Sequence, residues 1–165
     1  MIEIRKASLD DYTVIREIAG RTWPDTYLPI LTREQIGYML DMMYSLQAYT
    51  EQLLVKGHHF LLAADDGVFL GFASYEVNHS SETTRIHKLY VLPEAQGKGI
   101  GQKLIALIEN EAAKNTNDKI VLNVNRYNKA VEFYLKSGFV KAGEEDINIG
   151  SGYLMEDFIM RKDIK

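Results

Sequence analysis

Three alternate glycines between residues 97 and 101 constrain the fold more than any other feature of the sequence. An apolar stretch, 85–91, precedes them and is ended by Pro93, because proline cannot donate a hydrogen bond to a central strand ladder. After the glycines, apolar residues recur at helical spacing over 100–112, and a second apolar stretch follows at 119–124. Two neighbouring strands joined through a helix run parallel. The order therefore predicts a strand, a glycine turn, a helix and a parallel strand.

The other hydrophobic patterns extend this unit into a mixed α/β (α+β) fold. Helical spacing and capping signals predict helices over 9–21, where Pro24 follows, around 36–43, over 46–55 and over 128–136. Alternating or continuous apolar residues predict further strands over 1–6, 59–64, 68–77, 139–147 and 153–161. We expect one domain, residues 1–165, with a central, mostly antiparallel sheet of about seven strands flanked by helices.

Composition and charge exclude several classes of protein. The chain has no cysteine, which excludes disulfides, thiolate metal sites and a cysteine nucleophile. Its formal net charge is -4 and its basic residues are scattered, which argues against a nucleic-acid partner. No stretch reaches the ~20 apolar residues that span a bilayer. Residues 1–6 alternate apolar with charged side chains, unlike a signal peptide. We expect a cytoplasmic protein with no membrane partner.

The glycine turn itself predicts an anion-binding site. Glycine lets the backbone approach a ligand closely, and successive N–H groups at the start of a helix attract the oxygens of a pyrophosphate. Two common phosphate motifs do not fit this stretch. Counted from Gly97, the nucleoside-triphosphate loop and the dinucleotide fingerprint both need glycine at position 102, where the chain has Gln102. Neither of these nucleotide sites is therefore expected.

A third spacing does fit. Gln96, Gly99 and Gly101 fill the pattern Gln/Arg-x-x-Gly-x-Gly/Ala directly after the strand and proline at 88–93, and this segment resembles the acetyl-CoA signature of the GNAT superfamily of N-acetyltransferases. A second segment, 125–139, resembles the other recurrent stretch of that family, in which an asparagine and an alanine precede Phe-Tyr-x-x-x-Gly-Phe. The resemblance implies a GNAT-like fold and acetyl-CoA as cosubstrate. The alternative is that the glycines only ease a tight turn.

The resemblance also assigns residues to the cofactor. It implies that the strand end pairs with pantetheine, that the turn holds the diphosphate, and that two residues of the second segment contact the cofactor: Leu89, Tyr90, Val91, Gln96, Gly97, Lys98, Gly99, Ile100, Gly101, Gln102, Asn128 and Tyr134. Asn125 is an alternative to Asn128, because both precede Ala130. Lys98 is equally explained as an exposed loop lysine.

Two residues are candidates for proton transfer. The resemblance implies that Tyr134 protonates the departing thiolate. The alternative is a tyrosine of the core, because Tyr134 lies at helical spacing from apolar neighbours. His87 could accept the proton of the amine, directly or through water, or it could be an interior histidine. The remaining histidines, His58, His59 and His79, are expected in solvated loops, and no metal is assigned.

These features lead to one main hypothesis and two alternatives. We expect transfer of the acetyl group to a primary amine of a small molecule or polyamine, by direct attack in a ternary complex. Acetylation of a protein N-terminus or lysine is the first alternative, and a non-catalytic acyl-CoA-binding module is the second. Trp23, Tyr27 and Tyr38 are candidates for the acceptor pocket, although Trp23 and Tyr38 also suit the core. A homodimer is left open.

Overall fold

The computed structural model describes residues 1–164, which form seven strands, five α-helices and two short 3-10 helices. The strands are β1 (Ile2–Lys6), β2 (His59–Asp65), β3 (Val68–Ser80), β4 (Thr83–Val91), β5 (Lys119–Asn125), β6 (Val140–Gly150) and β7 (Tyr153–Asp163). The helices are η1 (Leu9–Asp11), α1 (Tyr12–Tyr27), α2 (Arg33–Tyr44), α3 (Leu46–Leu54), η2 (Pro93–Ala95), α4 (Ile100–Lys114) and α5 (Ala130–Lys136). Within these residues, no helix is long and apolar enough to cross a membrane.

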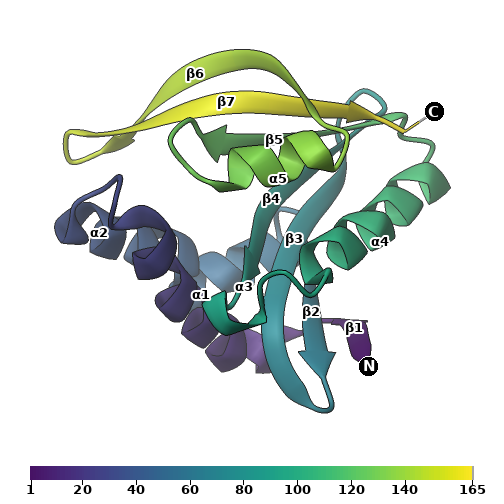
Figure 1. The fold of residues 1–165 in the computed structure, drawn as a ribbon, viewed down its shortest axis with the longest axis horizontal. Helices are drawn as coiled ribbons and strands as arrows, with labels where there is room; N and C mark the ends of the chain where they lie inside the picture. Colours follow the sequence, from purple (N-terminus) through teal and green to yellow (C-terminus); the bar gives the residue numbers. More distant parts are fainter. Residues whose placement is uncertain (165) are drawn as a thin grey trace.

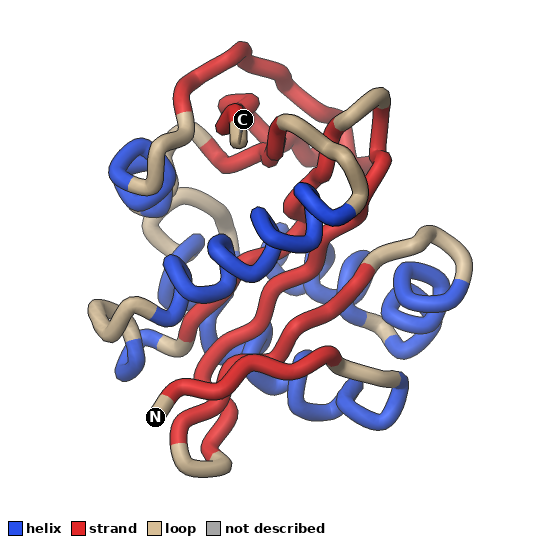
Figure 2. Tube along the Cα trace, turned by 90° about the vertical axis from the view of Figure 1, so that its right-hand side faces the viewer, coloured by secondary structure: helices blue, strands red, loops and turns tan. Residues whose placement is uncertain are grey.

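The strands form one twisted sheet in the order β1-β2-β3-β4-β5-β7-β6 (Figures 1 and 2). Every neighbouring pair is antiparallel except β4 and β5, which are parallel and joined through the glycine turn and α4. Helices α1 and α2 lie on one side of β3 and β4, and α4 lies on the other (Figure 1). The predicted mixed α/β fold and its parallel unit are therefore confirmed.

Helix α4 is held against the sheet by the apolar stripe read in the sequence. Ile100, Leu104, Ile108 and Ala112 are all 1% exposed or less. They recur at intervals of four residues, so they share one face of the helix. Burial of this face fixes the start of α4, and with it the glycine turn, at the end of β4.

Helix α1 continues through Pro24 to Tyr27, so the predicted end at Arg21 is wrong. An interior proline costs a helix about 3 kcal/mol, because it removes one hydrogen bond and crowds the preceding turn. Trp23 and Tyr27 lie on either side of it, are 1% and 5% exposed, and have ring centroids 4.5 Å apart. Burying each such side chain contributes about 2–3 kcal/mol. This burial outweighs the cost of the proline.

Strands β4 and β5 pair over only four residues each, the last of which are Ile86 and Leu122. Beyond this point β4 continues to Val91 beside β3 alone, and β5 continues to Asn125 beside β7 alone. The two strands part, and their facing edges have no partner strand. The parting opens the centre of the sheet.

Candidate functional site

Two cavities adjoin the place where β4 and β5 part. The glycine-turn cavity, of about 480 Å³, is bounded by the turn before α4, the end of β4 and α5. The inner cavity, of about 350 Å³, lies among α1, α2 and strands β4 to β7. Five residues line both cavities: Leu89, Tyr90, Asn128, Ala130 and Tyr134. Ligands in the two cavities would meet at this junction.

The glycine turn presents bare backbone to the glycine-turn cavity. Gly97 and Gly99 have φ of 83° and 80°, which L side chains rarely adopt, and a Cβ at either would meet nothing within 4 Å. Gly99 is also the N-cap of α4, so the free N–H groups of the first helical turn belong to residues that line the cavity. The open space and these donors fit an anionic group such as a pyrophosphate.

Most residues that the resemblance assigns to the cofactor meet in this cavity. All of them line it except Lys98, which is exposed and lies outside the lining. Asn128 lines both cavities, whereas Asn125 lines only the inner one. The Asn128 Oδ1 atom accepts a hydrogen bond from the Ala130 N–H at 2.9 Å and thereby fixes the start of α5. Of the two asparagines, Asn128 is thus the one that borders the glycine-turn cavity.

Tyr134 stands at the junction of the two cavities. Its ring packs against Phe133 and Phe139, with centroids 5.3 and 5.6 Å away. The side chain is 6% exposed, and its hydroxyl makes no hydrogen bond within residues 1–164. Burial raises the pKa of Tyr134, so the hydroxyl is protonated at neutral pH. Tyr134 is thus a packed residue that also keeps a free proton donor at the junction.

A β-bulge interrupts β4 at His87, beside the inner cavity. Ser74 of β3 lies opposite Lys88, but Tyr75 lies opposite Ile86, so His87 is the extra residue. In a regular strand His87 and Lys88 would point to opposite faces. The bulge breaks this alternation, and both residues are among those of β4 that line the inner cavity.

Three histidines lie around the carboxylate of Glu76 in β3, beside the inner cavity. Its Oε1 atom lies 2.9 Å from His87 Nε2, 3.0 Å from His79 Nδ1 and 3.8 Å from His58 Nε2. Burial alone would raise the pKa of Glu76, but the bonds from His87 and His79 leave it lowered. Glu76 is therefore a carboxylate that accepts the Nε2 proton of His87, and the lone pair of His87 is on Nδ1.

The environment also sets the charge of the two inner histidines. Burial lowers the pKa of His87 to about 4, although the Glu76 bond opposes this, and burial lowers the pKa of His58 to about 3. Their rings stack with centroids 3.8 Å apart. Both rings are neutral at physiological pH.

The expected place of the other histidines in solvated loops is wrong for all three: His58 lies in a loop but is buried, and His59 and His79 are exposed but belong to β2 and β3. Ligand atoms of His58, Glu76 and His87 lie within 4.8 Å of one another, and their types suit a divalent metal ion. The two rings, however, are only 13° from parallel, so their lone pairs run side by side and do not converge. His58 Nδ1 also lacks the hydrogen-bond partner that orients a metal-binding histidine. The group is better described as a Glu76–His87 hydrogen bond with the His58 ring stacked on His87.

Asp157 of β7 lines the inner cavity, although no motif in the sequence indicates it. Its side chain is 5% exposed, its Oδ1 atom has no partner, and Oδ2 lies 3.3 Å from the Asn123 side-chain amide. Burial raises the pKa of Asp157, while the Asn123 bond acts in the opposite direction. The available signal was a charged residue in line with Met155 and Ile159, on one face of a predicted strand.

The aromatic candidates for the acceptor pocket divide into two groups. Trp23 and Tyr27 line the inner cavity, and the Tyr27 hydroxyl lies 3.1 Å from that of Tyr90 at the junction. Tyr38 lies outside the lining and donates a hydrogen bond to the Ile149 carbonyl at 2.7 Å. Tyr38 therefore fastens α2 to β6.

Known proteins resemble the chain in sequence and in fold. A family model described as an acetyltransferase (GNAT) domain matches residues 27–154. The spermidine N(1)-acetyltransferase of Thermoplasma acidophilum is 30% identical over 94% of this chain and 96% of the relative. The aminoalkylphosphonate N-acetyltransferase of Salmonella typhimurium is 28% identical over 79% and 88%. The solved structure of the PaiA N-acetyltransferase from Thermoplasma acidophilum, in complex with coenzyme A, matches with a TM-score of 0.82 and 30% identity over 99% of each chain.

Proposed function

The chain belongs to the GNAT family of acetyltransferases, and from this premise we propose that it transfers an acetyl group from acetyl-CoA to a primary amine of a small molecule. Membership makes it an acetyl-CoA-dependent N-acetyltransferase, while the acceptor and the route of the protons are the proposed part. The observation that carries the proposal is the free hydroxyl of Tyr134 at the junction of the two cavities. The relatives named above for spermidine and for aminoalkylphosphonates support a small-amine acceptor.

The glycine-turn cavity is the proposed site of acetyl-CoA. The backbone of Gly97 and Gly99 faces open space, and the N-terminus of α4 supplies donors for the diphosphate. The free edge of β4 at 89–91 can pair with the amides of pantetheine, as an added strand would. Bound in this way, acetyl-CoA supplies the activated acetyl group at the junction.

The inner cavity is the proposed site of the amine, which must lose a proton before it can attack. An alkylamine has a pKa of roughly 10.4 and is mostly protonated at neutral pH. His87 is the proposed acceptor of that proton, directly or through water, because it lines the inner cavity and its Nδ1 atom carries the lone pair that Nε2 does not have. A backbone N–H of the 89–91 edge donates to the carbonyl oxygen of the acetyl group.

The bond changes then balance between the two cavities. The amine nitrogen forms a bond to the acetyl carbon as the bond from that carbon to sulfur breaks. Tyr134 donates its proton to the departing sulfur, which leaves as the thiol of coenzyme A. The nitrogen of the product then loses its remaining surplus proton to solvent, and a proton from solvent restores the Tyr134 hydroxyl. The high pKa of Tyr134 keeps its hydroxyl protonated until that moment.

Replacement of Tyr134 by phenylalanine tests this assignment. Tyr134→Phe keeps the ring packing but removes the proton, so kcat should fall on the order of 10²-fold while the Kd for acetyl-CoA changes little. Thiol release and calorimetry measure the two quantities. Tyr127→Phe is the control, because Tyr127 is exposed and lies outside both cavities. An equal loss of kcat and of affinity would mean that Tyr134 only packs.

A further inference from the structure

The charged side chains of the inner cavity are mostly cationic. Among the described residues that line it, Arg85 and Lys88 are basic and Asp157 is the one acid. A polyamine carries several ammonium groups and needs several carboxylates, because a buried charge must be paired. The acidic run at 144–146 lies outside the lining, and its carboxylates already bond to side chains of β5 and of the loop after it. The cavity is therefore suited to a single ammonium group.

Asp157 offers the place for that ammonium group. Its buried Oδ1 atom has no partner, and Asn123 donates to Oδ2. Tyr27 lines the same cavity as Asp157, and burial chiefly raises the pKa of Tyr27, with the charge of Asp157 adding to this effect. Tyr27 in turn bonds Tyr90 at the junction. An amine held at Oδ1 would therefore lie in the cavity that meets the junction at Tyr90.

Arg85 offers a place for an anion. Its side chain is half-buried and lines the inner cavity, and it makes no hydrogen bond or ion pair within residues 1–164. His87 and Asp157 line the same cavity as Arg85, and although burial is the larger influence on the pKa of each, the charge of Arg85 lowers both. A guanidinium presents a planar fork of donors that matches a carboxylate. Asp157 and Arg85 thus present opposite charges to one cavity.

Lys88 adds a second cation beside the cavity. Its Nζ atom donates to Gln52 Oε1 at 2.9 Å and lies 5.4 Å from the centre of the Tyr44 ring. Burial lowers the pKa of Lys88 to about 7, so part of the population is charged at neutral pH. An anionic group in the cavity would favour the charged form.

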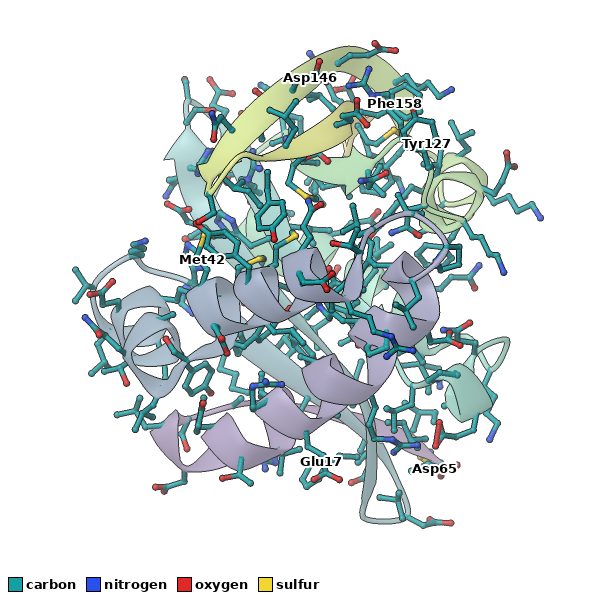
Figure 3. All side chains as sticks on the ribbon, turned by 90° about the vertical axis from the view of Figure 1, so that its left-hand side faces the viewer. Glu17, Met42, Asp65, Tyr127, Asp146 and Phe158 are labelled. Atoms are coloured by element: carbon teal, nitrogen blue, oxygen red, sulfur yellow. The ribbon has the colours of Figure 1, made fainter. Side chains whose placement is uncertain are left out.

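Methionines form much of the remaining wall. Met39, Met42 and Met43 of α2 and Met155 of β7 line the inner cavity. Met42 lies on the side of α2 that faces the β6–β7 hairpin (Figure 3). Thioether side chains are flexible and adapt to unbranched apolar groups. The wall suits an aliphatic chain.

We propose that the acceptor is an amino acid with an apolar side chain, whose ammonium group binds Asp157, whose carboxylate binds Arg85 and whose side chain lies against the methionines. This inference rests on the proposed function and names the acceptor class within it. It separates the chain from enzymes that act on polyamines.

A matched pair of acceptors tests the inference. L-norleucine and n-pentylamine differ only by the carboxylate, and spermidine represents the polyamines. Thiol release from acetyl-CoA should give a kcat/KM for norleucine about 10- to 100-fold above that for pentylamine, as expected for a charged hydrogen bond. Spermidine should be the poorest of the three. If pentylamine or spermidine equals norleucine, the inference is overturned while the proposed function stands.

Substitution of Arg85 tests whether this residue causes the preference for norleucine over pentylamine. Arg85→Gln should bring the norleucine-to-pentylamine ratio of kcat/KM close to one, because the carboxylate loses its partner. Arg161→Gln, at an exposed arginine outside the cavity, should leave the ratio as in the wild type. Equal losses on both acceptors in Arg85→Gln would overturn the inference.

Binding gives a readout that does not depend on turnover. Trp23 is the single tryptophan and lines the inner cavity, so its fluorescence should report acceptors added to the protein saturated with coenzyme A. Norleucine should change the emission of the wild type at concentrations where pentylamine does not. An identical response to both would contradict the inference. If acetyl-CoA binds but no amine releases thiol, the proposed function fails, and the inference fails with it.

Discussion

Glu76 determines which nitrogen of His87 can take a proton. It accepts the Nε2 proton, so only Nδ1 is basic. We expect His87→Gln to lower turnover on the order of 10²-fold, because glutamine can still bond to Glu76 but cannot accept the proton of the amine. The affinity for acetyl-CoA should not change, since His87 lies outside the glycine-turn cavity. Steady-state kinetics and calorimetry measure the two effects, and unchanged turnover would indicate that water alone accepts the proton.

His58 and His87 also predict how stability depends on pH. Their folded pKa values, about 3 and about 4, lie below the usual 6.5, so between pH 6.5 and 4 the unfolded chain binds protons that the folded chain does not. The free energy of unfolding should therefore decrease as the pH falls through this range. Urea denaturation at a series of pH values checks this. In the double variant His58→Gln, His87→Gln, the free energy of unfolding should depend less steeply on pH. An equally steep dependence would mean that other titratable groups cause it.

Continuous motifs in the sequence indicated some of the residues that line the two cavities. Residues that the fold alone brings to the cavities were not predicted. Tyr134 and Asn128 stand in one continuous segment, so their neighbours in the chain identify them. Asp157 is unremarkable in sequence, and its significance depends on burial opposite β5. Arg85 likewise reads as an ordinary strand residue until the cavity shows that it lacks a partner. Long-range burial and pairing cannot be read from spacing alone.

The glycine turn joins backbone conformation to ligand binding. At Gly99, with φ of 80°, alanine should cost about 1 kcal/mol of stability and weaken acetyl-CoA binding, because the turn must relax. Thermal unfolding and calorimetry measure the two losses. Gly37→Ala is the matched control: Gly37 is in α2, a Cβ there meets nothing within 4 Å, and alanine favours the helix. Equal affinity in Gly99→Ala and wild type would argue against a backbone cradle.

The spacing of apolar residues predicted the order of helices and strands. It did not predict two interruptions of regular structure. The helix predicted around 36–43 is α2, and Thr32 caps it by accepting a bond from the Gln35 N–H. The proline inside α1 and the bulge at His87 in β4 depend instead on what packs around them. Local propensity predicts an element well when the surroundings agree with it.

The β6–β7 hairpin is anchored across the molecule to α2. Tyr38 bonds the Ile149 carbonyl, and the Gln35 side chain bonds the Leu154 carbonyl at 3.2 Å. We expect Tyr38→Phe to cost about 1 kcal/mol, the usual net contribution of one hydrogen bond. It should raise the KM of the amine more than that of acetyl-CoA, because the hairpin borders the inner cavity only. Denaturation and steady-state kinetics test this, and equal changes in both KM values would contradict it.

The parted strands also bear on the cohesion of the protein as a whole. β1 to β4 form one continuous ladder and β5 to β7 another, and only four residues of each middle strand bridge them. Pantetheine bound in the gap would supply the hydrogen-bond partners that the facing edges of β4 and β5 lack. The sheet would then be continuous only while the cosubstrate is bound. Amide hydrogen exchange on both sides of the gap should then slow together, and release of coenzyme A should loosen the two ladders again.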